Sequence, residues 1–280
     1  MNKPDKLVIF DYSGTLSPES PRFARPENLL RALEESGLFS VGVTTPEIFW
    51  EEIVGPTWID GSTTAIGYKQ VMAKRIETLG LAPGATVAEI AAASSRFVDR
   101  FLAHSRIDPH WRSLLERLTG CPGVAVIVAT DHYAETTGTI IRYLHAWDIP
   151  AQKAGEMTGY CVPIFVANSA DIGFWKADRR FWEVLKPQYP PETVRSVLII
   201  DDFGFNEAEG DIYKEQSGIE RRRIKTAAIL GEVFQAGVEV IPFFLDSGES
   251  EGASALRIAE TGERIVRFLD STDTKITSRK

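Results

Sequence analysis

The chain has 280 residues, which corresponds to one or two domains, and its formal net charge is −8. This acidity argues against a nucleic-acid coat or a surface that docks on anionic lipid. Apolar residues make up 44% and charged residues 25%, proportions that exclude a disordered chain. The longest apolar runs, such as 124–129 and 240–245, are far shorter than the roughly 20 residues that a membrane-spanning helix needs.

The N-terminus and the cysteines bear on the cellular compartment. The N-terminal sequence MNKPDKLVIFD reaches an aspartate after a short apolar stretch, so it does not have the pattern of a signal peptide. Cys121 and Cys161 are too few for a disulfide scaffold or a structural zinc site. We therefore expect a cytoplasmic protein in which both thiols are free.

Short apolar, β-branched runs mark the predicted strands, which are 7–10, 124–129, 164–167, 197–200 and 238–244. Several of these runs are apolar throughout rather than alternating, which is typical of strands covered on both faces. Helical patterns separate them, at 110–118, 134–147 and 179–185. Strands that alternate with helices predict an α/β fold with a parallel sheet and right-handed crossovers.

One long interval breaks the alternation. From about residue 17 to residue 105 the predicted elements are all helices, at 26–35, 46–54, 65–79 and 87–103. Pro26 stands in a first turn, Thr45 is suited to cap a helix, and Gly55 is expected to end one. The first strand therefore leads into a helical insertion, and the sheet resumes near Asp108.

Three further segments have predicted roles outside these elements. Asp246–Ser254 is expected to be a solvated loop, and Arg221–Arg223 the exposed start of a helix. Trp58 falls in a predicted loop between Gly55 and Gly67, where it would face either a substrate or the interior of the insertion.

Polar side chains follow the predicted strands or open the next helix. They are Asp11 with Ser13 and Gly14 after 7–10, Thr130 after 124–129, Lys176 before 179–185, and Asp201-Asp202 after 197–200, with Asn206 and Glu207 close behind. In an open α/β sheet, ligands bind beyond the carboxyl ends of the strands. We therefore expect these side chains to build one site.

This set of groups suits phosphoryl transfer. A carboxylate can attack phosphorus, while a hydroxyl and an ammonium group can hold the equatorial oxygens of the phosphate. Two or three carboxylates can hold Mg²⁺, which prefers oxygen ligands.

The same residues resemble the four motifs of the haloacid dehalogenase-like (HAD) superfamily of phosphohydrolases. In chain order, the counterparts are Asp11–Thr15 for Asp-x-Asp-x-Thr, Thr130 for the second motif, Lys176 with Asp178 and Phe181 for the third, and Asp201-Asp202 for the fourth. The helical insertion between the first two motifs is similar to the C1-type cap of that family. The resemblance covers nearly the whole chain.

The resemblance implies a division of the chain and a role for each motif residue. Residues 1–16 and 106–280 would form a Rossmann-like core, and residues 17–105 a helical cap domain. Asp11, Ser13 and Lys176 occupy catalytic positions, and Asp11 would be the nucleophile that forms an aspartyl-phosphate. The phosphate would be held by Thr130, Lys176 and Gly14. The ligands of Mg²⁺ would be Asp11, the backbone carbonyl of Ser13, Asp201 and Asp202.

Ser13 departs from the family pattern. The aspartate that the family has at this position protonates the leaving group and then activates water, and a serine cannot do this near neutral pH. Positioned acid–base catalysis is typically worth about 10²–10⁴-fold. His132, just past Thr130, and Lys69, in the insertion, are the first candidates to replace it.

The expected function is therefore a Mg²⁺-dependent hydrolase of a small phosphorylated metabolite, with no nucleic-acid or membrane partner. Three alternatives stay open because of Ser13. They are C–P bond cleavage of a phosphonate substrate with Lys69 as a Schiff base, phosphoryl transfer to another acceptor, and a catalytically weak phosphate-binding or regulatory protein. Dehalogenation is disfavoured, because it does not need the acidic pair Asp201-Asp202.

Overall fold

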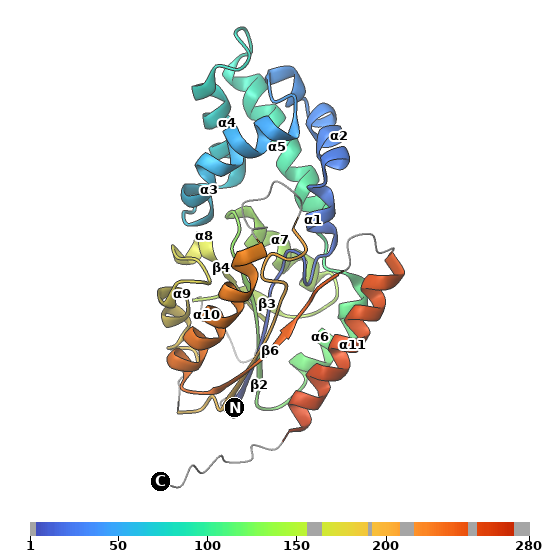
Figure 1. The fold of residues 1–280 in the computed structure, drawn as a ribbon, viewed down its shortest axis with the longest axis vertical. Helices are drawn as coiled ribbons and strands as arrows, with labels where there is room; N and C mark the ends of the chain where they lie inside the picture. The colour runs from blue at the N-terminus through green and yellow to red at the C-terminus, as the bar shows by residue number, and fades with distance from the viewer. Residues whose placement is uncertain (1–3, 156–163, 190–191, 208–215, 246–250, 272–280) are drawn as a thin grey trace.

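The described part of the molecule contains a six-stranded parallel sheet in the order β3-β4-β2-β1-β5-β6 (Figure 1). The computed structural model describes residues 4–155, 164–189, 192–207, 216–245 and 251–271. The strands are β1 Lys6–Phe10, β2 Val124–Thr130, β3 Ala151–Lys153, β4 Ile164–Asn168, β5 Ser196–Asp201 and β6 Gly237–Pro242. The predicted α/β class with a parallel sheet is confirmed.

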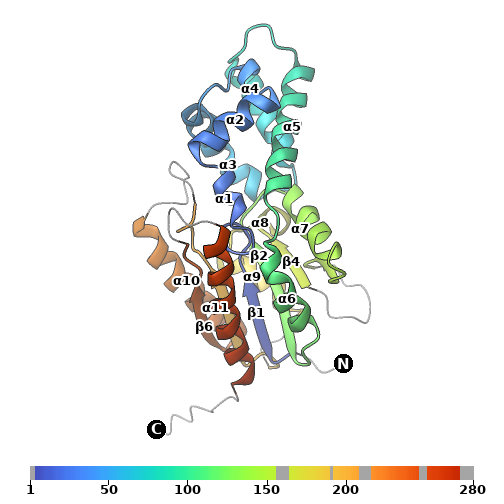
Figure 2. The ribbon, with the colours of Figure 1, turned by 90° about the vertical axis from the view of Figure 1, so that its right-hand side faces the viewer.

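Helices cover both faces of the sheet, which explains why its strands are apolar throughout. Val8 and Phe10 of β1 belong to an apolar core with α6, α7 and α11, the face that Figure 2 shows from the front. Leu7 and Ile9 of the same strand belong to a core with α9 and α10. The helices are α6 Arg112–Thr119, α7 Glu135–His145, α9 Arg179–Leu185, α10 Gln216–Phe234 and α11 Glu251–Asp270.

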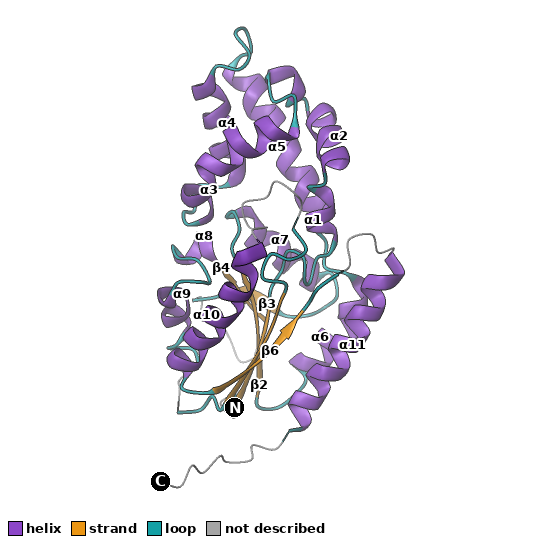
Figure 3. Ribbon diagram, viewed as in Figure 1, coloured by secondary structure: helices purple, strands orange, loops and turns teal. Residues whose placement is uncertain are grey.

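A second, purely helical part stands beyond the carboxyl ends of the strands (Figure 3). Its helices are α1 Glu19–Phe23, α2 Pro26–Ser36, η1 Phe39–Val41, η2 Ile48–Val54, α3 Gly55–Ser62, α4 Tyr68–Leu79 and α5 Val87–His104. They pack around a separate apolar core that includes Leu33, Phe49, Met72 and Phe97. The helical elements expected between residues 17 and 105 are therefore present.

The predicted end of a helix at Gly55 is wrong. Residues Ile48–Val54 form a π-helix that runs directly into α3, and Gly55 itself has right-handed helical angles, with φ −52° and ψ −53°. Pro56 is the second residue of α3, so the chain passes a residue without an N–H at the point where the π-helix gives way to the α-helix. Trp58 consequently lies on a helix and not in a loop.

The C-terminal half contains elements that the sequence analysis did not find. They are β3, the short helix α8 Ser169–Ile172 and α11. The predicted loop 246–254 is wrong from residue 251 onward, because Ser254 continues the buried stripe of α11 formed by Ile258, Thr261 and Ile265. Residues 246–250 lie outside the described part. Arg221–Arg223 lie within α10 and not at its start.

Two expectations about the whole chain can be checked in the described residues. Cys121 is a free thiol, and Cys161 lies outside the described part. Among the helices of the described part, none is both long and apolar enough to cross a bilayer.

Candidate functional site

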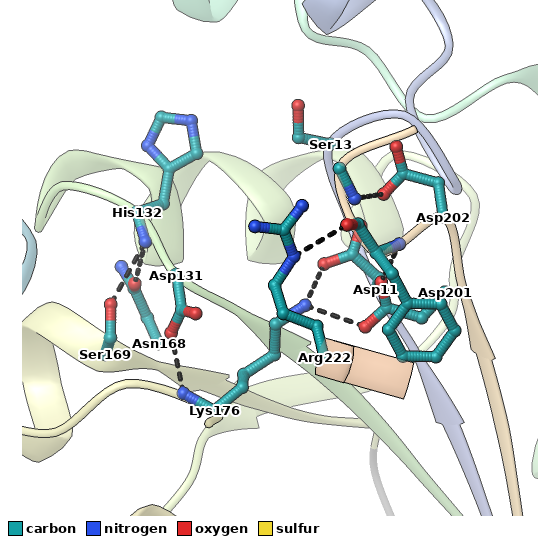
Figure 4. Close-up of polar contacts among 12 residues, drawn as sticks. Asp11, Ser13, Asp131, His132, Asn168, Ser169, Lys176, Asp201, Asp202 and Arg222 are labelled. Atoms are coloured by element: carbon teal, nitrogen blue, oxygen red, sulfur yellow. Dashed lines mark hydrogen bonds and ion pairs between the residues drawn. The ribbon is translucent and has the colours of Figure 1, made fainter. Parts of the chain in front are cut away.

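Three carboxylates meet where β1 and β5 end (Figure 4). Phe10 pairs with Ile200 in the sheet, and the backbone N–H of Asp11 donates to the Ile200 carbonyl oxygen at 2.8 Å. This register sets Asp11 beside Asp201, because the carboxyl ends of parallel strands share one edge. One carboxylate oxygen from each of Asp11, Asp201 and Asp202 lies within 4.8 Å of the others, and all three residues are buried.

Gly14 lets the loop after β1 approach this cluster. Its φ is +74°, and a Cβ atom on it would lie 2.7 Å from Oδ2 of Asp202, so a side chain is excluded twice over. Asn206 fixes the same loop by donating from Nδ2 to the carbonyl oxygens of Gly14 at 2.7 Å and Phe243 at 2.8 Å. The backbone N–H of Gly14 donates to the carbonyl oxygen of Ser17 at 3.0 Å, a bond that shapes the loop. Gly14 is not among the residues that line the cavity described below.

Lys176 neutralises part of the charge of the cluster. Its Nζ donates to Oδ1 of Asp11 at 2.5 Å and to Oδ2 of Asp201 at 2.9 Å, and its backbone N–H donates to Oδ1 of Asp131 at 2.9 Å. Burial opposes the charge of this ammonium group, but Asp11, Asp201 and Asp131 outweigh it and raise the pKa of Lys176 well above its ordinary value.

The carboxylates themselves are electrostatically strained. Burial raises the pKa of Asp11 well above its usual range, and Asp201 and Asp202 add to this, although Lys176 acts in the opposite direction. Burial, followed by repulsion from Asp201, raises the pKa of Asp202 to about 7. Lys176 pairs with Asp11 and Asp201, while Asp202 accepts from the backbone N–H groups of Gly204 and Asn206. The three carboxylates together offer an all-oxygen donor set. These residues fit a hard divalent cation such as Mg²⁺.

The raised pKa of Asp202 predicts how the stability of the protein depends on pH. The ordinary carboxyl pKa of 3.8 applies to the unfolded chain, so the folded state binds this proton more tightly. The stabilisation is complete below about pH 4 and is lost as the pH rises through about 7. In EDTA, we expect the midpoint of thermal unfolding to fall between pH 5 and pH 8.

Magnesium should reverse this loss. We expect 5 mM Mg²⁺, roughly the concentration that fills a weak oxygen site, to raise the midpoint by at least about 3 °C at pH 8 and by much less at pH 5. Asp202→Asn should remove most of the increase. An equal Mg²⁺-induced shift at both pH values would contradict a cation bound by these carboxylates.

Thr130 and His132 lie at the adjacent strand end. Thr130 is buried, pairs with Asn168 across β2 and β4, and lines the same cavity as Asp11. Nδ1 of His132 accepts from the backbone N–H of Tyr133 at 2.9 Å and lies 2.8 Å from Oγ1 of Thr136. Burial lowers the pKa of His132 to about 4, so the ring is neutral near pH 7 and is held by its neighbours.

Lys69 lies apart from the cluster. Its Nζ forms an ion pair with Asp99 at 2.5 Å, and it is not among the residues that line the cavity. In the described part, Lys176 is the only lysine that does. Lys69 is therefore not placed to replace an aspartate at position 13. His132 does line the cavity, but its Nδ1 is engaged by Tyr133 and Thr136.

Two charged residues near the cluster were not assigned a role from the sequence. Oγ of Ser13 lies 3.1 Å from Oε1 of Glu207 and 3.1 Å from Oγ of Ser20. Arg222 of α10 donates from Nε to the carbonyl oxygen of Phe203 at 2.9 Å, and it lines the cavity (Figure 4). Glu207 follows the acidic pair closely, and the loop between them has positive φ at Phe203 (54°) and Gly204 (82°).

A cavity of about 400 Å³ connects these groups to the helical part. Its wall includes Asp11, Thr130 and Lys176 from the sheet side and Trp58 and Phe101 from the helices above. The helical part also contacts the sheet side directly. The Trp175 indole N–H donates to Oγ of Ser62 at 2.8 Å, and Glu135 of α7 accepts from the first backbone N–H of α4 at 2.8 Å.

No protein-family model matches the sequence, and no match was found among curated proteins. Among solved structures, the chain is similar to a 2-haloacid dehalogenase from Pseudomonas syringae pv. Tomato DC3000. The two are 19% identical over 96% of this chain and 100% of the other, with a TM-score of 0.52. The chain has the haloacid dehalogenase-like fold. At 19% identity the likeness shows the fold alone. It confirms the HAD-like fold that the four motifs predict.

Two other similar structures have lower scores. A predicted HAD-like family hydrolase from Porphyromonas gingivalis is 14% identical, with 95% of this chain and 98% of that chain covered and a TM-score of 0.47. A predicted phosphoglycolate phosphatase from Haemophilus somnus 129PT is 15% identical, with coverage of 78% and 83% and a TM-score of 0.40. The chain thus spans nearly the full length of the first two HAD-like structures.

Proposed function

We propose that this protein is a Mg²⁺-dependent hydrolase of phosphate monoesters that acts through an aspartyl-phosphate on Asp11. The observation that carries the proposal is the buried trio Asp11, Asp201 and Asp202, which lines a cavity of about 400 Å³. Lys176 forms ion pairs with Asp11 and Asp201 of this trio. We place the enzyme in the cytoplasm, where its two cysteines would remain free thiols. Residues 17–105 would act as a cap that closes over the substrate.

The chain's own residues divide the work of the first step. Lys176 donates a hydrogen bond to Oδ1 of Asp11. The other carboxylate oxygen of Asp11 would attack phosphorus as the bond from phosphorus to the ester oxygen breaks. Lys176 and the Thr130 hydroxyl would hold the oxygens of the phosphoryl group during transfer. Mg²⁺, held by Asp11, Asp201 and Asp202, would supply positive charge beside those oxygens. Water would then hydrolyse the aspartyl-phosphate and return Asp11 to its starting state.

Glu207 is the group that we assign to proton transfer in place of an aspartate at position 13. Its Oε1 lies 3.1 Å from Oγ of Ser13, so a carboxylate from a different segment reaches the place where that aspartate would project. Glu207 also lines the cavity, as a group that meets a leaving oxygen must. It would protonate the departing alkoxide and then take a proton from the attacking water.

The other reactions have less support from the described contacts. The lysine expected to form a Schiff base for C–P cleavage, Lys69, pairs with Asp99 and does not line the cavity. Lys176 does line it, but its ammonium group pairs with Asp11 and Asp201. Dehalogenation of a small haloacid makes no use of Asp201 and Asp202. Phosphoryl transfer to another acceptor and a weakly catalytic, phosphate-binding protein would share the same site, so turnover must separate them from hydrolysis.

A comparison of phosphate release with halide release tests the proposal. With Mg²⁺, we expect a panel of phosphate monoesters to yield inorganic phosphate, and EDTA to lower the rate at least about 100-fold, the scale of losing a metal that offsets transition-state charge. Added Mg²⁺ should restore the rate. Halide release from 2-chloropropionate in EDTA, without phosphate release from any ester, would replace the proposal by dehalogenation.

A further inference from the structure

The wall of the cavity changes character between its two sides. On the side of the sheet it carries the acidic cluster, Lys176 and Arg222. The helices above contribute mainly aromatic side chains, which are Phe23, Phe49, Trp50, Trp58, Tyr68, Phe97 and Phe101. Among the described residues of this wall, every charged side chain comes from outside residues 17–105.

The aromatic side of the cavity is built by rings that support one another. Tyr68 stacks on Tyr133, with centroids 3.8 Å apart and an angle of 4° between the planes. Trp58 meets the same Tyr133 ring edge-on at 5.3 Å, and Phe49 packs against Phe97 at 5.1 Å. Such contacts hold the rings in place, so the cavity is formed before a ligand enters.

These features restrict the part of the substrate that points away from the phosphate. The polar atoms that these rings offer are the indole N–H groups of Trp50 and Trp58 and the Tyr68 hydroxyl, so several hydroxyls on that part would lose more hydrogen bonds to water than this side of the wall returns. An apolar or aromatic group would instead be buried favourably in the same place. A volume of about 400 Å³ lies in the range that accepts a ring-sized organic group together with a phosphate.

We propose that the substrate is the phosphate monoester of an alcohol with an aromatic or bulky apolar body, which lies in the chamber formed by Trp58, Tyr68, Phe101 and their neighbours. This assignment rests on the proposed function, since it names the substrate class of the same site. The phosphate lies at Asp11, and the ring lies under the helices.

Binding of phosphonates tests the chamber separately from hydrolysis. We would compare 2-phenylethylphosphonate with ethylphosphonate by calorimetry in the presence of Mg²⁺. The two differ by a phenyl ring, and burying that ring should tighten binding at least about tenfold. Equal affinity, or tighter binding of 3-phosphoglycerate than of either phosphonate, would overturn the assignment.

Turnover of matched esters tests the two proposals together. Phenethyl phosphate, ethyl phosphate and glycerol 1-phosphate all release a primary alkoxide, so a difference in kcat/KM reports the chamber and not the leaving group. We expect phenethyl phosphate to exceed the other two at least about tenfold. Hydrolysis without that preference overturns the substrate class alone. Tighter binding of 2-phenylethylphosphonate than of ethylphosphonate, without turnover of any ester, overturns the proposed hydrolysis alone.

A pair of neighbouring variants on α3 locates the effect. Trp58→Ala should lower the phenylethyl-to-ethyl affinity ratio at least about fivefold, because it removes an aromatic wall. Ile59→Ala changes the adjacent side chain, which is 61% exposed and does not line the cavity, and should leave the ratio unchanged. If both variants leave the ratio at the wild-type value, the ring does not lie against Trp58 and the proposed chamber is wrong.

Discussion

Asp11→Asn should lower kcat for the best phosphate ester by at least about three orders of magnitude, the scale on which loss of an essential nucleophile acts. The amide keeps the shape of the side chain and can still accept a hydrogen bond from Lys176 through its oxygen. It cannot form an acyl-phosphate with a useful lifetime, and it removes one anionic donor from the buried trio. The measurement is steady-state phosphate release under saturating Mg²⁺.

A matched substitution separates this effect from a general loss of carboxylates. Asp60→Asn alters an exposed carboxylate of α3 that does not line the cavity, and its kcat should equal that of the wild-type protein. Rapid acid quenching should trap a phosphoryl group on the wild-type chain and on Asp60→Asn, but not on Asp11→Asn. Retention of more than about a tenth of the wild-type kcat by Asp11→Asn would exclude the covalent route.

The sheet and the acidic cluster could be predicted because each depends on short-range patterns. Strands such as β2 and β5 are apolar throughout since helices cover both of their faces, and parallel strands bring their carboxyl ends to one edge. Asp11, Thr130 and Asp201 stand at the carboxyl ends of neighbouring parallel strands, so the strand order alone brings their side chains together. Lys176 does not end a strand but precedes α9, so its contact with Asp11 and Asp201 depends on the loop before that helix.

The particular contacts of the site depend on geometry that no local pattern encodes. Glu207 is close to the acidic pair in sequence, but its contact with Ser13 follows a loop with positive φ at Phe203 and Gly204. Arg222 looked like part of an exposed basic run, but its position in α10 turns it toward the cavity. Gly55 predicts the end of a helix, and therefore a loop at Trp58, whereas in the structure the chain stays helical through Gly55. The aromatic chamber is therefore a property of the packed helices.

Glu207→Gln should separate the two halves of the proposed reaction. The glutamine keeps a hydrogen-bonding group beside Ser13 but cannot exchange a proton, so kcat should fall about 10²–10⁴-fold. With 4-nitrophenyl phosphate, whose leaving group needs no acid, Asp11 should still be phosphorylated rapidly. Hydrolysis of the aspartyl-phosphate should then be slow, which gives a burst of one 4-nitrophenolate per chain and a phosphorylated protein visible by intact mass.

A second-site change decides whether Glu207 acts by proton transfer or by holding the loop. In the Glu207→Gln background, Ser13→Asp supplies a carboxylate from the position that contacts Glu207 in the native chain, and it should restore at least about a tenth of the lost turnover and shrink the burst. Glu220→Gln, which alters an exposed carboxylate of α10, should show neither the burst nor the loss. A Glu207→Gln variant with wild-type turnover and no phosphorylated protein would transfer the role to another group. If Ser13→Asp does not restore turnover in the Glu207→Gln background, the loss is not the loss of a carboxylate. Glu207 would then act by ordering the loop around Asp202.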